Sequence, residues 1–113
     1  MRWSTPSQTL LELLERSLVG VDFQRRKMFG QFALFLNGNM LGGVFEETVF
    51  LRYPPTEQEK LFETLDEVSR FDPTKGRAMG EYVVIPGSVF ADPETRQALL
   101  DRAVSYVEQL PPK

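Results

Sequence analysis

The spacing of apolar residues changes along this chain, and each change predicts a new element. In the first twenty-odd residues, leucines recur every three or four positions, which is typical of a helix with one buried face. Thr5-Pro6-Ser7-Gln8 favours a helix start, and Gly20 favours a left-handed stop near its end. The residues predicted to face the core are Leu10, Leu13, Leu14, Leu18 and Val21.

From Lys27 to Tyr53 the period falls to two, which predicts an antiparallel β-meander. Asn37-Gly38 suits a two-residue type I′ turn because both residues tolerate positive φ. The next strand runs from Thr48 and stops at Pro54-Pro55, where amide donors are missing. The turn predicts a register that pairs Leu36 with Asn39, Leu34 with Leu41, Phe32 with Gly43 and Gly30 with Phe45.

Both faces of this predicted meander are apolar. Phe32, Leu34 and Leu36 share one face, while the opposite face carries Ala33, Phe35, Met40, Gly42 and Val44. A sheet that is apolar on both faces must be covered on both, so we expect helices on one side and a further element or a partner on the other.

The second half of the chain predicts two more helices and two more strands. Thr56-Glu57-Gln58-Glu59 is a capping box before a helix that ends by Ser69, and Asp92-Pro93-Glu94 starts a last helix with a wide apolar face. A short strand at Phe71 leads into a turn through residues 72–77, and Met79–Ile85 predicts a strand. The predicted order is α-β-β-β-α-β-β-α, an α+β fold with an antiparallel sheet packed by helices in one domain over residues 1–113.

The amino-acid composition excludes several kinds of catalytic and metal-binding site. The 113 residues include no cysteine and no histidine, which excludes disulfides, thiolate metal sites and every catalytic couple that uses a thiol or an imidazole. We expect no catalytic residues, no metal and no cofactor. A net charge of −3 argues against direct nucleic-acid binding, and the apolar runs are too short for a membrane span. A cytoplasmic protein is the expectation.

Three stretches together resemble the TfoX/Sxy N-terminal domain family. They are Arg26-Lys27-Met28-Phe29-Gly30, the turn Leu36-Asn37-Gly38-Asn39-Met40, and Gly76-Arg77-Ala78-Met79-Gly80-Glu81-Tyr82 with Ile85-Pro86 after it. The likeness runs from about Arg26 to Leu110. It implies a fold like that of YgaC-type proteins and type III secretion chaperones.

The resemblance also implies a regulatory role, because the founding members are bacterial regulators of natural competence thought to act with the cyclic-AMP receptor protein. Two departures stand out. Gln31 occupies a position where many members carry a second glycine, and the sequence up to Lys113 leaves no room for the C-terminal helical domain of the full-length regulators. A role in competence therefore does not follow from the shared domain.

Two basic segments are candidate anion sites. Arg25-Arg26-Lys27 precedes the predicted meander, and Lys75-Gly76-Arg77 could place two cations and backbone amides around an anion. The alternatives are a solvated strand entrance and an ordinary turn. Neither a P-loop nor a dinucleotide fingerprint is present. The carboxylate pairs Glu46-Glu47 and Asp66-Glu67 are better explained as solvated residues, and Tyr53, Tyr82 and Tyr106 as core residues.

The sequence thus supports a non-enzymatic binding or regulatory domain that acts by protein–protein interaction. A protein partner or a second copy would bind the second sheet face at Phe35, Met40 and Val44. The alternative is a small anion- or nucleotide-binding protein that uses Arg25, Arg26, Lys27, Lys75 and Arg77.

Overall fold

The computed structural model of the chain describes residues 8–28, 31–71 and 80–113. Its centre is a six-stranded antiparallel sheet in the order β1-β2-β3-β4-β6-β5. The strands are β1 (Gln24–Met28), β2 (Gln31–Leu36), β3 (Asn39–Phe45), β4 (Thr48–Arg52), β5 (Ser69–Arg70) and β6 (Tyr82–Pro86). The helices are α1 (Gln8–Arg16), α2 (Pro55–Thr64), α3 (Gly87–Phe90) and α4 (Pro93–Glu108). The predicted α+β class with an antiparallel sheet is confirmed.

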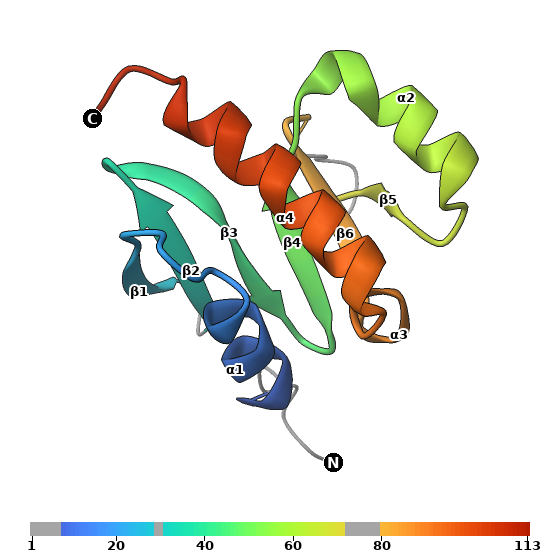
Figure 1. Cartoon of the computed structure of the whole chain (residues 1–113), viewed down its shortest axis with the longest axis horizontal. Coiled ribbons are helices and arrows are strands. Elements are labelled where there is room, and N and C mark those ends of the chain that lie inside the picture. The colour runs from blue at the N-terminus through green and yellow to red at the C-terminus, as the bar shows by residue number, and fades with distance from the viewer. Residues whose placement is uncertain (1–7, 29–30, 72–79) are drawn as a thin grey trace.

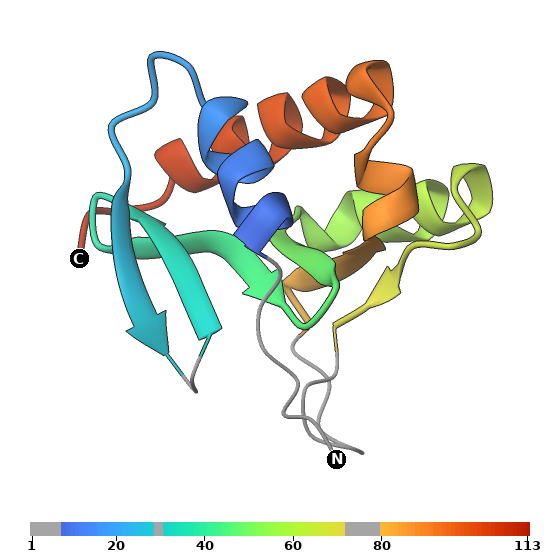
Figure 2. The same ribbon diagram turned by 90° about the horizontal axis from the view of Figure 1, so that it is seen from below.

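All four helices lie on the same side of the sheet, with α4 crossing its middle and α1 beside it (Figures 1 and 2). The main core fills the space between these helices and the sheet. Leu11 and Leu14 of α1, Leu51 and Ile85 of the sheet, and Phe90 are at most 1% exposed there. The helix-side core therefore joins the helices to the four inner strands β2, β3, β4 and β6.

Two of the predicted helix starts have different outcomes. The Asp92 carboxylate accepts a hydrogen bond from the Thr95 amide at 3.0 Å, and this bond lowers the pKa of Asp92, so the predicted cap of α4 is confirmed. The capping box predicted at Thr56 is wrong, because the N-cap of α2 is Pro54, two residues earlier, and no side chain caps the helix. The predicted start at Thr5 lies outside the described residues.

The sequence also missed two elements. Residues 24–28 form a strand of their own, β1, which pairs with β2, and residues 87–90 form the short helix α3. The strand β1 was hidden because its sequence, QRRKM, is mostly polar. Such a composition suits the edge of a sheet, where charged residues face solvent on both sides.

The turn between β2 and β3 has the predicted geometry, but the strand pairing beyond it differs from the predicted register. Asn37 and Gly38 have φ values of 53° and 83°, as a type I′ turn requires. Leu36 pairs with Asn39 and Phe35 with Met40, but Leu34 then pairs with Gly42. Leu41 is thus the extra residue of a β-bulge. The predicted pairings of Leu34 with Leu41 and of Phe32 with Gly43 are wrong. The predicted pairing of Gly30 with Phe45 lies outside the described residues.

The bulge exchanges the faces of all later residues of β3. Val44, predicted for the second face, is fully buried in the helix-side core, and Phe45 lies on the second face instead. This exchange follows because side chains alternate along a strand, so one extra residue moves each following side chain to the other face. Val44 therefore cannot contribute to a partner surface there.

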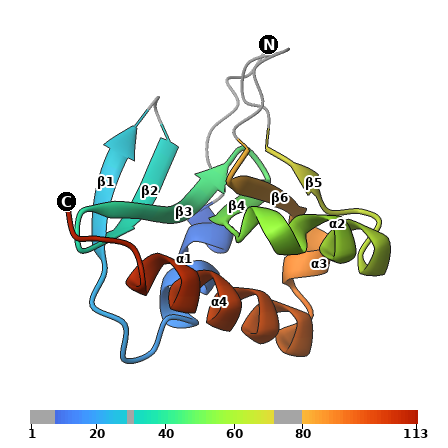
Figure 3. The same ribbon diagram turned by 90° about the horizontal axis from the view of Figure 1, so that it is seen from above.

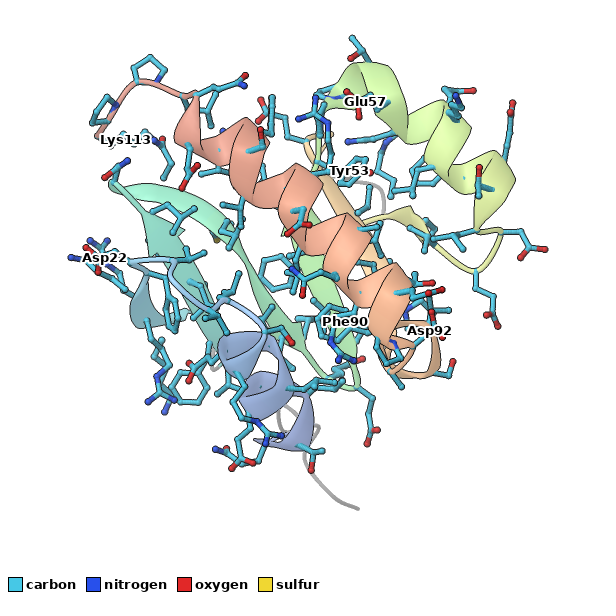
Figure 4. The ribbon with its side chains drawn as sticks, viewed as in Figure 1. Asp22, Tyr53, Glu57, Phe90, Asp92 and Lys113 are labelled. Atoms are coloured by element: carbon cyan, nitrogen blue, oxygen red, sulfur yellow. The ribbon has the colours of Figure 1, made fainter. Side chains whose placement is uncertain are left out.

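The last residues of the chain contact this same turn. The Lys113 amide donates to the Asn37 carbonyl at 2.9 Å, and the Asn39 side-chain amide donates to the Pro111 carbonyl at 2.9 Å. Figure 4 shows Lys113 beside the β2–β3 turn. Asn39 is only 5% exposed, so its hydrogen bond satisfies a buried polar group.

Two glycines in β3 allow the backbones of neighbouring strands to approach closely. A Cβ on Gly43 would collide with the Phe32 carbonyl oxygen, and one on Gly42 with the Phe50 carbonyl oxygen. Both obstacles are backbone atoms of strands held on either side of β3, so they cannot move as a side chain could. Glycine is needed at both positions.

We therefore predict that Gly43→Ala lowers the free energy of unfolding by about 2–4 kcal/mol. Gly80→Ala is the matched control, since a Cβ at Gly80 meets no atom within 4 Å. Urea denaturation of both variants measures the difference. Equal stability of the two variants would contradict the close approach at Gly43.

Candidate functional site

The surface of the sheet that faces away from the helices carries an aromatic cluster, which we call the second face. Its buried members come from β2, β4, β6 and the residue after β5, and they are Ala33, Phe35, Phe50, Phe71 and Tyr82. Met40, Phe45 and Val84 are partly buried around them. No described helix covers this face (Figures 2 and 3).

The aromatic rings of the second face contact one another. The rings of Phe50 and Phe71 stack with their centroids 4.6 Å apart and their planes 2° apart. Phe45 meets Phe71 edge-on at 5.5 Å, and Tyr82 meets Phe50 edge-on at 6.2 Å. The four rings thus form one continuous layer that spans β3 to β6, and such pairs add stability beyond their buried area.

Arginines lie over two rings of this face. The Arg26 guanidinium is 4.6 Å from the centroid of the Phe35 ring, and the Arg52 guanidinium is 5.6 Å from that of Tyr82. Arg52 also forms an ion pair with Glu81, with its Nε 2.7 Å from the carboxylate. Cations favour the faces of aromatic rings, so the second face combines an apolar layer with positive charge.

The basic run Arg25-Arg26-Lys27 is not a single patch, because it lies within a strand. Cross-strand partners share a face, and Arg26 is paired with Ala33, which lies on the second face. Arg25 is paired with Leu34 and points to the helix side, where its Nε lies 3.4 Å from the Glu15 carboxylate. Lys27 is paired with Phe32, so its side chain lies on the helix side, like that of Arg25. The predicted three-cation anion site is therefore divided between two faces of the sheet.

The predicted site residues have different places in the fold. Phe35, Met40 and Tyr82 lie together on the second face, and Arg26 lies over Phe35. Val44 does not join them. Met28 belongs to β1, while Phe29, Gly30, Lys75, Gly76, Arg77 and Met79 lie outside the described residues. The turn expected to hold Lys75 and Arg77 is thus not placed relative to the second face.

Burial raises the pKa of the Tyr82 hydroxyl, and the nearby Arg52 opposes this rise. Its oxygen lies 3.5 Å from the Met40 carbonyl, to which it donates. Burial also raises the pKa of Tyr53 and of Tyr106. These shifts keep the three hydroxyls protonated and uncharged near neutral pH.

The sequence missed one buried polar residue, Gln58 of α2, which is 1% exposed. Its amide nitrogen donates to the carbonyls of Tyr53 at 3.1 Å and Gly80 at 2.9 Å. Its amide oxygen lies 3.4 Å from both Nε and Nη2 of Arg70. Gln58 thus ties α2 to the end of β4 and to the residues before β6. Gln58 is three, four and seven residues before Leu61, Phe62 and Leu65, so it lies on the apolar stripe of the helix. This spacing is the feature of the sequence that indicates its burial.

Within residues 8–28, 31–71 and 80–113, no group of three acidic side chains is placed to hold a metal ion. The helices in these same ranges include none that is long and apolar enough to cross a bilayer.

A family model described as the TfoX N-terminal domain matches residues 13–106 of the 113-residue chain. The chain belongs to the TfoX N-terminal domain family. The family is of a regulatory type, and the antiparallel sheet with its packed helices agrees with a TfoX N-terminal fold. Comparisons with curated proteins and with solved structures gave no match.

In this TfoX N-terminal domain, we predict that Gln58→Leu lowers the free energy of unfolding by about 1–3 kcal/mol, because the buried Tyr53 carbonyl and the part-buried Gly80 carbonyl lose their donor. Glu59→Leu is the matched control, since the neighbouring side chain is exposed. Thermal and urea unfolding would check the difference. Equal loss in the two variants would argue against the role of Gln58.

We also predict that the folded TfoX N-terminal domain resists ionisation of Tyr82. A raised folded pKa means that the folded state keeps the proton more tightly than the unfolded state. The resulting stability is fully present below the unfolded pKa of about 10 and is lost as pH rises through the folded pKa. Tyrosinate absorbance of the wild type and of Tyr82→Phe, each folded and in urea, would measure this. Coincident folded and unfolded titrations would contradict it.

Proposed function

We propose that this chain is a cytoplasmic, non-enzymatic regulatory domain that acts by binding another protein chain through the second face. Membership of the TfoX N-terminal domain family supports the regulatory role. The observation that carries the binding surface is the aromatic layer on the face of the sheet that no described helix covers. An apolar sheet surface of this kind gains stability when a second surface packs on it.

The end of the second face beside β1 is the part that we assign to binding. Phe35 is 9% exposed, and the Arg26 guanidinium lies over its ring. Met40, the cross-strand partner of Phe35, is partly exposed. An approaching partner would therefore meet Arg26 and Met40 first. Arginine and methionine are both enriched in protein interfaces, where they combine apolar contact with adaptable geometry.

The anion-binding alternative has less support from the described residues. It needs several cations around one ligand, but Arg26 is separated from Arg25 and Lys27 by the sheet itself. Arg25 also has a carboxylate beside it already. Protein binding remains the stronger proposal, and we retain no second function.

The simplest occupant of the second face is a second copy of this chain, and the strand β1 offers a matched pair of variants to test it. Arg26→Glu changes the second face, and Lys27→Glu makes the same change of charge on the opposite face of the same strand. Light scattering over a range of concentrations should show self-association of the wild type. Arg26→Glu should weaken it by about five-fold or more, whereas Lys27→Glu should leave it nearly unchanged.

Equal effects of the two variants would contradict the assigned surface. A strictly monomeric wild type would exclude a second copy and leave a different protein as the occupant. Co-purification from the native host with the same two variants as baits then decides, because a partner of the second face is retained by Lys27→Glu and lost by Arg26→Glu. Retention by both variants would remove the proposal.

A further inference from the structure

A groove on the helix side of the molecule lies between the end of α1 and one face of α4. It has a volume of about 310 Å³ and is lined by the turn that follows α1 and by successive turns of α4. The lining residues are Ser17, Leu18, Val19, Val21, Gln97, Leu100, Asp101, Val104, Ser105 and Glu108. The groove is on the other side of the sheet from the second face, so it is independent of the function proposed above.

The local backbone explains how the groove forms. α1 ends at Arg16, and the Val21 amide donates to the Leu18 carbonyl at 3.2 Å, which closes a turn around Gly20 with its φ of 78°. Leu18 enters the core and is 4% exposed. Val19 is consequently directed outward and is 88% exposed at the edge of the groove.

The floor and the rim of the groove differ in chemistry. Leu18 and Leu100 are buried in its floor, and Val21 and Val104 are partly buried beside them. The exposed Asp101 and Glu108 carry carboxylates at its rim, and none of the described lining residues is a cation. The groove therefore offers apolar surface next to negative charge.

The two arginines of α4 bind other groups, so they do not neutralise the carboxylates of Asp101 and Glu108. Arg96 donates to the carbonyls of Phe90 and Ala91 at 3.2 Å, at the end of α3. Arg102 forms a bidentate ion pair with Glu57 of α2. The pairing with Arg102 lowers the pKa of Glu57. Among the described residues, the ion pairs formed include neither Asp101 nor Glu108.

We infer that this groove binds a segment of a partner protein that carries aliphatic side chains flanked by lysine or arginine. The exposed Val19 and the apolar floor would contact the aliphatic side chains, and Asp101 and Glu108 would contact the cations. From Gln97 to Glu108 the groove follows about three turns of α4, a length that suits a short amphipathic helix packed along it. Charge complementarity selects the basic segment over an acidic one.

The probe is a fluorescein-labelled helical peptide with leucines along one face and lysines beside them, and its partner peptide has glutamates in place of the lysines. Fluorescence anisotropy with the full chain should show binding of the lysine peptide only, and binding should weaken at high salt. Asp101→Asn with Glu108→Gln should reduce affinity by about five-fold or more. Val19→Ser should reduce it by about three-fold, since it removes an exposed aliphatic contact.

Non-specific attraction to an acidic chain is controlled by Glu59→Gln with Glu63→Gln, which removes the same two charges from exposed positions of α2. This control should bind the lysine peptide like the wild type. Equal losses in the two double variants, or no binding at all, would overturn the proposal. Reduced self-association of Val19→Ser in light scattering would also overturn it, because a second copy would then be the occupant.

Discussion

The bulge at Leu41 decides which side chains of this domain meet the helices and which do not. β3 lies between β2 and β4, so its register is transmitted to both neighbours. The extra residue brings both Leu41 and Val44 to the helix side, where α1 and α4 pack. It also sends Phe45 to the second face, where it meets Phe71. Without the bulge, the helix-side core would lose Val44 and the aromatic layer would lose one ring.

The two sides of the sheet differ in the kinds of residue that they carry. On the helix side, most of the buried residues are aliphatic, and they pack into one core. On the second face, rings contact rings and arginines lie over them. An aromatic ring has a negative face that attracts a nearby cation, whereas an aliphatic side chain has no such face. A surface built in this way can lie near water and still offer apolar contact.

Much of the fold follows from local patterns in the sequence, because those patterns act over short distances. The helix cap at Asp92, the turn at Asn37-Gly38 and the alternation in β2 each depend on a few neighbouring residues. The bulge could not be predicted in this way, since it depends on how closely Gly42 and Gly43 approach the flanking strands. β1 is a strand because it pairs with β2, and its own polar sequence does not indicate a strand. Part of the candidate site could be predicted from the sequence, because the two-residue period alone places Phe35 and Met40 on the second face. The position of Val44, and the division of the basic run between two faces of the sheet, follow only from the pairing of the strands.

The charged edge of the sheet affects how two copies of this domain could pair through their outermost strands. A sheet that is apolar on both faces is prone to polymerise when its outermost strand pairs with that of another molecule. In β1, three consecutive cations would meet the same cations of a second molecule in such a pairing. β5, at the other edge, is only two residues long and offers few free backbone groups. Both edge strands of the sheet thus disfavour pairing with the edge of another copy.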